Sequence, residues 1–232
     1  MPSVEQAYGD LEQDRAIRET EIRLIERYFA ETEDENERKS LGRTLVLLTY
    51  AHLEGFTKFA LITYAEVING MKLACHDAAL PLVAASLNRV FAALRDVNSK
   101  HEMFKDAPSD HAVHLQARQL RFIEGYDSVM AQVVNIPDSA IDTGQNLDAR
   151  MLKRALFQLG LNYPAIEEHH DTLNRLLGER NAIAHGDILK RPKATDIEAY
   201  LSMTFKVMLF IQQEIFQALN TGAYVRAPAN DA

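Results

Sequence analysis

One long apolar stretch constrains the fold of this chain more than any other feature. The stretch LVLLTYAHLEGFTKFALITYAEVI begins at Leu45 and has 24 residues, enough to cross a bilayer as a helix. Charged and polar side chains are costly inside a membrane. Four of them interrupt the stretch: His52, Glu54, Lys58 and Glu66. The sequence therefore predicts a helix over residues 38–70 that is buried at the centre of a helical bundle, with no membrane as a partner.

The composition favours helix along the rest of the chain as well. Among 232 residues, glycine (10) and proline (7) are scarce, and 47% of the residues are hydrophobic. A chain of this length buries a substantial core and forms one domain or at most two. The predicted class is all-α, with the helices packed in an antiparallel bundle.

Apolar spacing and end signals place the individual helices. They predict helices over these ranges: 3–31, 38–70, 81–97, 110–130, 148–160, 164–185 and 195–220. Ser3 with Gln6, and Thr195 with Glu198, have the spacing of capping boxes. Residues 133–146 carry Pro, Gly, Asn and Asp without a helical period, which predicts an ordered loop.

The acidic charge is concentrated at the N-terminus. The formal net charge is −8, and residues 1–40, with 12 acidic and 6 basic side chains, account for −6 of it. A protein that coats nucleic acid through a broad basic surface is therefore excluded.

We expect three parts: an acidic amphipathic helix at 1–36, a helical domain at 37–222 and a flexible tail at 223–232.

Cysteine usage and the first residues bear on the compartment. Cys75 is the single cysteine, so neither an intrachain disulfide nor a cysteine zinc cluster can form. The first residues, MPSVEQAYGD, lack the basic and apolar regions of a signal peptide. We therefore expect a cytoplasmic protein.

The stretch GERNAIAHGDI, residues 178–188, gathers three functional side chains at a predicted helix end. Asn181 and His185 are four residues apart and share a helix face, whereas Arg180 and His185 are about 140° apart in an ideal helix. For Arg180 and His185 to act on one ligand, one of three conditions must hold. The long arginine side chain reaches around the helix, the helix ends near His185, or a second copy of the chain supplies part of the site. Gly186 favours a helix end there.

The residue types in this stretch suit phosphoryl chemistry on RNA. Histidine exchanges protons near neutral pH, and a guanidinium donates a planar fork of hydrogen bonds to phosphate oxygens. Attack by a ribose 2′-hydroxyl needs a base, an acid and charge stabilisation, and it needs no metal when these are positioned. A structural alternative stays open, because Arg and His near a helix C-terminus also complement the helix dipole.

Three segments together resemble one known family. ERNAIAHG resembles the Arg-x4-His motif of the HEPN superfamily (higher eukaryotes and prokaryotes nucleotide-binding), in which a polar residue commonly follows the arginine. YAHLEGFTKF resembles the early helix of a prokaryotic defence or toxin-type branch, and IDTGQNLDARMLKRALFQLGL resembles the segment before its motif helix. The resemblance covers residues 38–220.

This resemblance implies a bundle of four core helices with additions, paired into a homodimer across a cleft. It implies a metal-independent endoribonuclease of toxin–antitoxin, abortive-infection or antiviral systems, with RNA and a possible antitoxin or other protein as partners and no cofactor. Arg180 would bind the scissile phosphate, His185 would transfer protons, and Asn181 would position the pair. Glu54 would hold the Arg180 guanidinium, with an exposed ion pair to Lys58 as the alternative. Tyr50 would line the same cleft, with a buried packing tyrosine as the favoured alternative.

Basic residues around the motif have two readings of equal weight. Arg175, Lys190, Arg191 and Lys193 contribute to a local excess of positive charge that could guide RNA, and the same charges suit a solvated turn. Histidine and acidic residues at 110–114 and 167–170 lack a complete ligand pattern, so no metal is expected.

The other open functions are a non-catalytic HEPN module that binds a nucleotide or protein, and a helical scaffold that docks a partner on its N-terminal helix.

Overall fold

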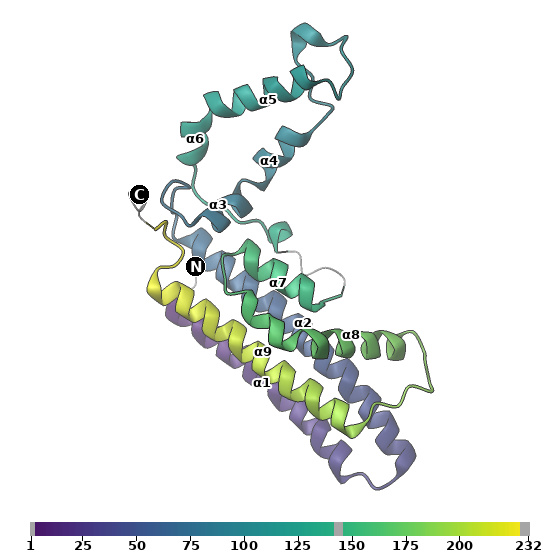
Figure 1. Ribbon diagram of the computed structural model, residues 1–232. Coiled ribbons are helices and arrows are strands. Elements are labelled where there is room, and N and C mark those ends of the chain that lie inside the picture. The colour runs from purple at the N-terminus through teal and green to yellow at the C-terminus, as the bar shows by residue number, and fades with distance from the viewer. Residues whose placement is uncertain (1–2, 142–145, 228–232) are drawn as a thin grey trace.

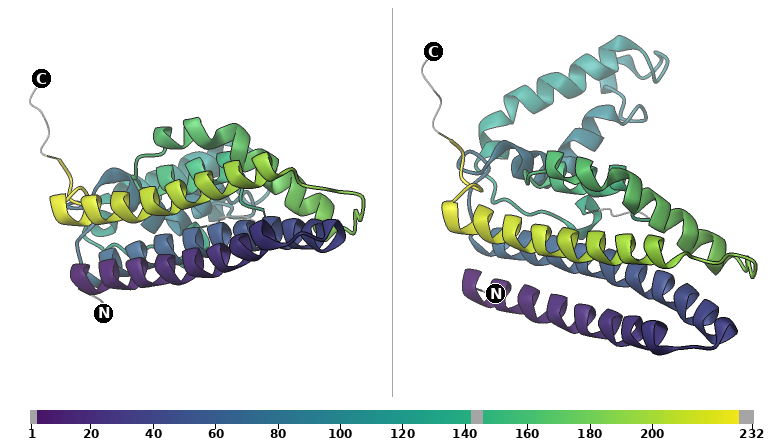
Figure 2. Two further views of the ribbon diagram at one scale, coloured as in Figure 1. Left: turned by 90° about the horizontal axis from the view of Figure 1, so that it is seen from below. Right: turned by 60° about the horizontal axis from the view of Figure 1, so that its bottom comes forward.

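Four long helices form the body of the protein. The computed structural model describes residues 3–141 and 146–227, which fold into nine α-helices and three short 3-10 helices, without a β-sheet. The four that pack together are α1 (Val4–Glu31), α2 (Glu35–Gly70), α8 (His170–Ala184) and α9 (Ala194–Thr221). Helices α1 and α8 run in one direction and α2 and α9 in the other (Figures 1 and 2). The predicted all-α bundle is confirmed.

Local capping defines the first two helices. At the start of α1, the Ser3 hydroxyl accepts a bond from the Gln6 backbone N–H at 3.1 Å, and the Gln6 side chain accepts one from the Ser3 N–H at 2.8 Å. The predicted capping box is confirmed. Helix α2 begins at Glu35 instead of residue 38, because Asp34 caps it through bonds from the backbone N–H groups of two following residues.

Helix α2 lies at the centre of the bundle, packed against α1, α8 and α9. By length and composition it qualifies as a membrane span, but half of its most apolar window is buried inside the protein. Tyr50, Phe56 and Tyr64 are among its largest buried side chains. Burial of one such side chain stabilises the fold by roughly 1.5–3 kcal/mol. The predicted central position of this helix is confirmed.

Helix α1 packs into the same bundle. It buries Ala7, Leu11 and Ile22, and the Arg15 guanidinium donates a hydrogen bond to the Gln212 side chain on α9 at 2.6 Å. These buried side chains of the acidic helix are therefore covered by α2 and α9, whereas Ile17, Leu24 and Tyr28 stay exposed.

The middle of the chain forms an arm that projects from the bundle (Figure 1). We expected one helix over 81–97, and the chain instead forms α3 (Leu80–Ser86) and α4 (Asn88–Arg95). The break follows Ser86, whose hydroxyl accepts a bond from the distant Asn135 backbone N–H at 2.9 Å. Helix α3 stays on the body beside α7 (Ala149–Gln158), whereas α4 packs on α5 (Ala112–Glu124).

The predicted helix over 110–130 also divides in two. It forms α5 (Ala112–Glu124) and α6 (Tyr126–Met130), and His111 caps α5 instead of the predicted Ser109 or Asp110. A 3-10 helix, η1 (Glu102–Phe104), lies at the outer end of the arm. The Arg118 guanidinium joins the two sides of the arm through bonds to backbone carbonyls on and after α4.

The segment after the arm returns to the body. It contains η2 (Asp138–Ala140), α7 (Ala149–Gln158) and η3 (Pro164–His169), so the predicted loop over 133–146 is partly helical. Residues 142–145 of that loop lie outside the described part of the chain. The predicted helix from Pro164 starts as 3-10 and becomes α-helical only at His170.

The last helix and the tail correct two further expectations. Helix α9 begins at Ala194 with Lys193 as its cap and without a side-chain cap bond, so the predicted box of Thr195 and Glu198 was wrong. Residues 223–227, expected in a flexible tail, are held against the segment before α3. The Tyr224 carbonyl accepts a bond from the Ala79 N–H at 2.8 Å, and Val225 forms an isolated bridge.

Candidate functional site

The predicted motif lies at the C-terminal end of α8. His185 is the C-cap, and its backbone N–H donates to the Asn181 carbonyl at 2.9 Å. Gly186 follows with φ +89°, and the Asp187 N–H reaches back to the Ala182 carbonyl at 3.0 Å. This pattern is a glycine-dependent helix stop, because residues with a side chain rarely adopt such a φ. The helix therefore ends where the motif places its histidine.

Three uncharged neighbours hold the Arg180 guanidinium. Its central carbon lies 4.6 Å from the centre of the Tyr50 ring, in a cation–π arrangement. Nη1 donates to the side-chain oxygens of Asn181 at 2.8 Å and of Asn146 at 3.1 Å. Among the described residues, no carboxylate lies within ion-pair distance of this guanidinium. Its position is fixed while its charge is left without a counter-ion from that part of the chain.

Tyr50 is fully buried and serves as the platform beneath Arg180. Its hydroxyl accepts a bond from the Leu147 backbone N–H at 2.5 Å and donates to Glu54 Oε1 at 3.2 Å. Burial, and next the nearby Glu54 charge, raise the pKa of Tyr50 to about 12, so the phenol stays neutral. Of the two readings for Tyr50, a residue that lines the RNA cleft and a buried packing tyrosine, its exposed fraction of 0% agrees with the second.

We expected a direct ion pair between Glu54 and Arg180, but the structure does not show one. The half-buried carboxylate accepts the Tyr50 hydroxyl bond one helical turn earlier on α2. Its link to Arg180 therefore runs through the tyrosine ring. Asn146 and Leu147, which complete this cluster, were not predicted, because they lie in a loop without a periodic signal.

The His185 side chain is exposed, and no hydrogen bond or ion pair joins it to another described residue. Asn181 is bonded to Arg180 instead of to His185, although it shares a face with the histidine. Within one chain, the structure thus brings Arg180, Asn181 and Tyr50 together and leaves the imidazole open to solvent.

The four predicted basic residues near the motif have different surroundings. Arg175 lies 3.6 Å from Asp196, and Lys190 lies 3.5 Å from Glu179, so both are partly neutralised. Lys193 caps α9. Arg191 lines a groove beside the motif loop.

This basic groove has a volume of about 420 Å³ and lies between the start of α2 and the loop after α8. Its lining residues are Asn36, Lys39, Ser40, Arg43, Ile188, Lys190 and Arg191. The Arg43 guanidinium donates to the Asp187 carbonyl at 2.6 Å, which fixes the loop that follows His185. Lys39 and Arg43 were not predicted, since nothing in the sequence shows that the start of α2 lies beside the motif.

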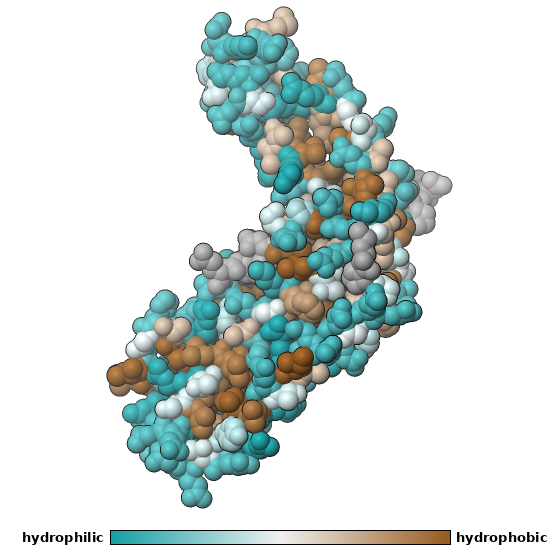
Figure 3. Space-filling model, turned by 180° about the vertical axis from the view of Figure 1, so that it is seen from behind, coloured by the Kyte–Doolittle hydropathy of each residue, from teal (hydrophilic) through white to brown (hydrophobic). Residues whose placement is uncertain are grey.

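A hydrophobic area covers the same end of the bundle on the face opposite to Figure 1 (Figure 3). Ile188 and Leu189 directly follow the motif and are 80% and 75% exposed. Two adjacent hydrophobic side chains this exposed are typical of a contact surface.

The other histidine and acidic residues have structural positions. His111 caps α5 through Nδ1, and His114 is buried and accepts a bond from the His101 N–H at 3.1 Å. His169 lies 3.0 Å from Glu168. In residues 3–141 and 146–227, no three such side chains are grouped as metal ligands would be.

The fold and the site together define a class: an all-α bundle with a cationic site at the end of an inner helix. Over residues 13–217 the sequence matches the family described as RiboL-PSP-HEPN. The chain therefore belongs to that HEPN family, and its resemblance to the HEPN superfamily is confirmed. Membership makes it a nuclease-type or nucleotide-binding module. No curated protein and no solved structure gives a match.

Proposed function

We propose that this chain is a metal-independent endoribonuclease that acts as a cytoplasmic homodimer in defence or in a toxin–antitoxin pair. The observation that carries the proposal is the Arg180 guanidinium, which is held by uncharged neighbours at the helix end that presents His185. A fixed cation that has no carboxylate partner among the described residues suits an anionic substrate. An exposed imidazole suits proton transfer with a group that arrives from solvent.

The proposed reaction uses the ribose next to the scissile phosphate. His185 accepts the 2′-hydroxyl proton, and the 2′-oxygen forms a bond to phosphorus while the bond from phosphorus to the 5′-oxygen breaks. The leaving 5′-oxygen takes up a proton from solvent water, and Arg180 stabilises the charge that develops on the phosphoryl oxygens. The products carry a 2′,3′-cyclic phosphate and a 5′-hydroxyl. Asn181 keeps the guanidinium in place.

The basic groove supports binding of RNA beside this site. Arg43 and Arg191 lie along it, next to the loop that begins at His185, and Lys39, which pairs with Glu35 at 2.5 Å, lies beside them. Phosphates that continue from the scissile bond would meet these cations, and the acidic remainder of the chain would repel RNA elsewhere.

A second copy of the chain is the proposed occupant of the hydrophobic area. Ile188 and Leu189 stand at the rim of the site, so pairing there would bring two motif ends together. The double change Ile188→Asp and Leu189→Asp should convert dimer to monomer in light scattering. Met103→Asp, at an 80% exposed residue of the arm, is the control and should leave the dimer intact. A monomeric wild type would refute the pairing.

The decisive experiment is incubation with mixed RNAs in EDTA, followed by end-group analysis. Cleavage should persist in the chelator and disappear in Arg180→Ala and His185→Ala. Arg150→Ala, at an arginine whose side chain is 88% exposed on α7, should cleave like the wild type. All variants are checked by circular dichroism. Full cleavage by both motif variants would remove the mechanism, whereas tight nucleotide or protein binding without any RNA product would favour a non-catalytic module.

The scaffold function receives less support from the fold. Leu11 and Ile22 of α1 are buried against α2 and α9. A partner that docks on α1 would find its charged face and three exposed hydrophobic side chains, those of Ile17, Leu24 and Tyr28. Deletion of residues 1–36 would also expose the core, so it does not separate docking from folding.

A further inference from the structure

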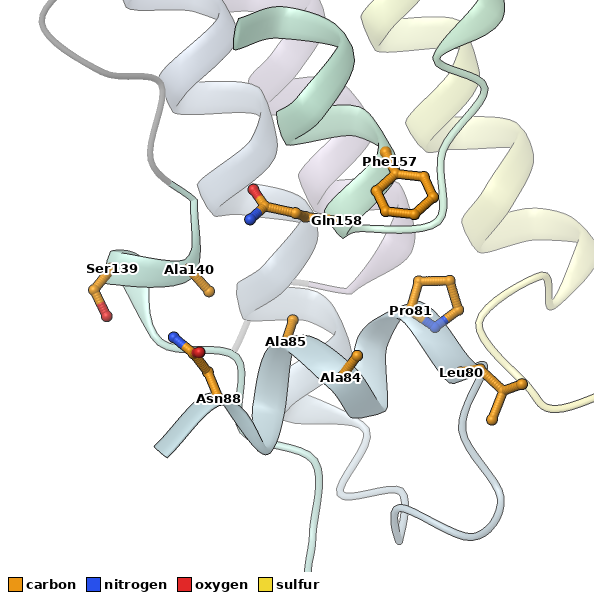
Figure 4. A pocket seen from close by; sticks show the side chains of 9 residues that line it. All are labelled: Leu80, Pro81, Ala84, Ala85, Asn88, Ser139, Ala140, Phe157 and Gln158. Atoms are coloured by element: carbon orange, nitrogen blue, oxygen red, sulfur yellow. The ribbon is translucent and has the colours of Figure 1, made fainter. Parts of the chain in front are cut away.

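A second cavity lies at the base of the arm, apart from the Arg180 site. It has a volume of about 430 Å³, within the range of sites for small molecules. Its walls come from α3, the first residue of α4, η2 and the end of α7 (Figure 4). The lining residues are Leu80, Pro81, Ala84, Ala85, Asn88, Ser139, Ala140, Phe157 and Gln158.

The elements around this cavity are fixed in place. Gly160, with φ +71°, lets the chain after α7 approach α3 so closely that a Cβ there would lie 3.2 Å from the Pro81 ring. The Asn69 side chain brackets the Ile136 backbone with bonds of 2.7 and 3.0 Å just before η2. The cavity is therefore formed before a ligand arrives, which lowers the entropic cost of binding.

The lining chemistry specifies a neutral ligand. Six of the nine lining residues are apolar, and the other three, Asn88, Ser139 and Gln158, are uncharged. A charged ligand would lose water here without gaining a counter-ion from the residues that line the cavity. Phosphates and carboxylates are thus disfavoured.

One polar atom in the wall lacks a partner. The side-chain oxygen of Gln158 is buried and accepts no hydrogen bond from the described residues. Buried acceptors in folded proteins are almost always bonded, so this oxygen lacks a donor, and because it is closed to water the Gln158 amide has to turn toward the cavity before a ligand N–H reaches it. The Asn88 amide lies at the same end of the cavity as Gln158 (Figure 4). The ligand that fits this end carries an N–H and, beside it, an acceptor.

The opposite end is hydrophobic. The Phe157 ring and the Pro81 ring lie there (Figure 4), and Phe157 is oriented by an edge contact with Tyr163 at 5.4 Å between centres. A flat apolar ring would pack between them. We propose that this cavity binds a small neutral molecule in which a flat ring is joined to an amide-type group, with the amide at Gln158 and Asn88.

Benzamide is the probe, and two molecules of similar shape are its controls. Acetophenone lacks the N–H, and benzoate carries a charge. In ¹H–¹⁵N NMR titrations of the full chain, benzamide should shift the side-chain amide signals of Asn88 and Gln158 with a dissociation constant on the order of a millimolar. Acetophenone and benzoate should each bind about tenfold more weakly. Equal binding of all three, or no saturable shift at these amides, would overturn the proposal.

Two pairs of variants locate the site. Ala84→Leu fills the cavity and should abolish the shifts, whereas Ala92→Leu, at an exposed alanine of α4 outside the lining, should keep them. Gln158→Met keeps the length of the side chain but removes the acceptor, and it should bring benzamide down to the affinity of acetophenone. Melting temperatures confirm folding. Benzamide binding that survives Ala84→Leu would place the ligand elsewhere and refute this site.

Discussion

The Tyr50 hydroxyl provides the sharpest test of how the site is held together. Tyr50→Phe keeps the ring beneath Arg180 but removes the only oxygen that accepts the Leu147 N–H within the described residues. Leu147 is 0% exposed, so its N–H cannot turn to water instead. A buried donor left without a partner costs about 1–3 kcal/mol.

The size of the chain converts this cost into a melting shift. For a protein of this length, 1 kcal/mol shifts Tm by about 2–4 °C, so a loss of about 2 kcal/mol lowers Tm by about 4–8 °C. Differential scanning calorimetry of the purified variant measures it. The Arg180 side chain should keep its position, because phenylalanine presents the same ring face.

Tyr64→Phe is the matched control on the same helix. Tyr64 is 2% exposed, and its hydroxyl forms no hydrogen bond with another described residue. Removal of this hydroxyl leaves no donor or acceptor behind, so Tm should stay near that of the wild type. Equal losses in Tyr50→Phe and Tyr64→Phe would refute the claim that the Leu147 bond holds the loop to α2.

Three further predictions concern the same region and the bundle. Gly186→Ala should lower the free energy of unfolding by about 1–2 kcal/mol because φ is +89°. Gly178→Ala, in open space within α8, should raise it by about 0.5–1 kcal/mol. Shifts of Tm in the same direction for both variants would contradict this. Burial lowers the pKa of His52 below 6.5, so the unfolded chain takes up protons first and stability should fall as the pH drops through 6.5. His52→Gln should flatten that fall, and an unchanged pH profile of Tm would refute it. Arg180→Lys, which loses the planar guanidinium over Tyr50, should slow RNA cleavage about 100-fold without unfolding the protein, and cleavage at the wild-type rate would count against the proposed role.

The helices that periodicity predicted well are those that bury one continuous face and carry local caps. Helix α1 begins at the predicted Ser3 box, and α2 ends at Gly70 as expected. The break at Leu87 could not be predicted in this way. No glycine or proline marks it, and the bond that accompanies it joins Ser86 to Asn135, a residue 49 positions further along the chain.

The start of α9 shows a local pattern that tertiary structure overrode. Thr195 and Glu198 have the right spacing, but the Lys193 carbonyl accepts bonds from the N–H groups of Asp196 and Ile197, both at 3.0 Å. Thr195 thereby falls inside the first turn, where its side chain cannot cap. The Asp196 carboxylate meets Arg175 of α8, a contact that no pattern within residues 195–198 reveals.

The candidate site was predictable in its residue types and only partly in its partners. The stretch around Arg180 marked a helix end, and Gly186 ends that helix as expected. Tyr50 and Glu54 are one turn apart on the same face of α2, so the sequence alone cannot tell which of them faces the guanidinium. That depends on how far α8 is shifted along α2, which is set by packing over the whole bundle.

The choice between these two partners has an electrostatic consequence. A carboxylate beside Arg180 would offset its charge, whereas an aromatic face and two amide oxygens fix the guanidinium, and no described residue offers it a counter-ion. The tyrosine must stay neutral for this to hold, and its pKa of about 12 ensures that it does at physiological pH. Glu54 contributes to that neutrality, because its charge opposes ionisation of the phenol. The carboxylate that we expected to bind the arginine thus acts one step away, where it keeps the platform uncharged and so preserves the positive charge above it.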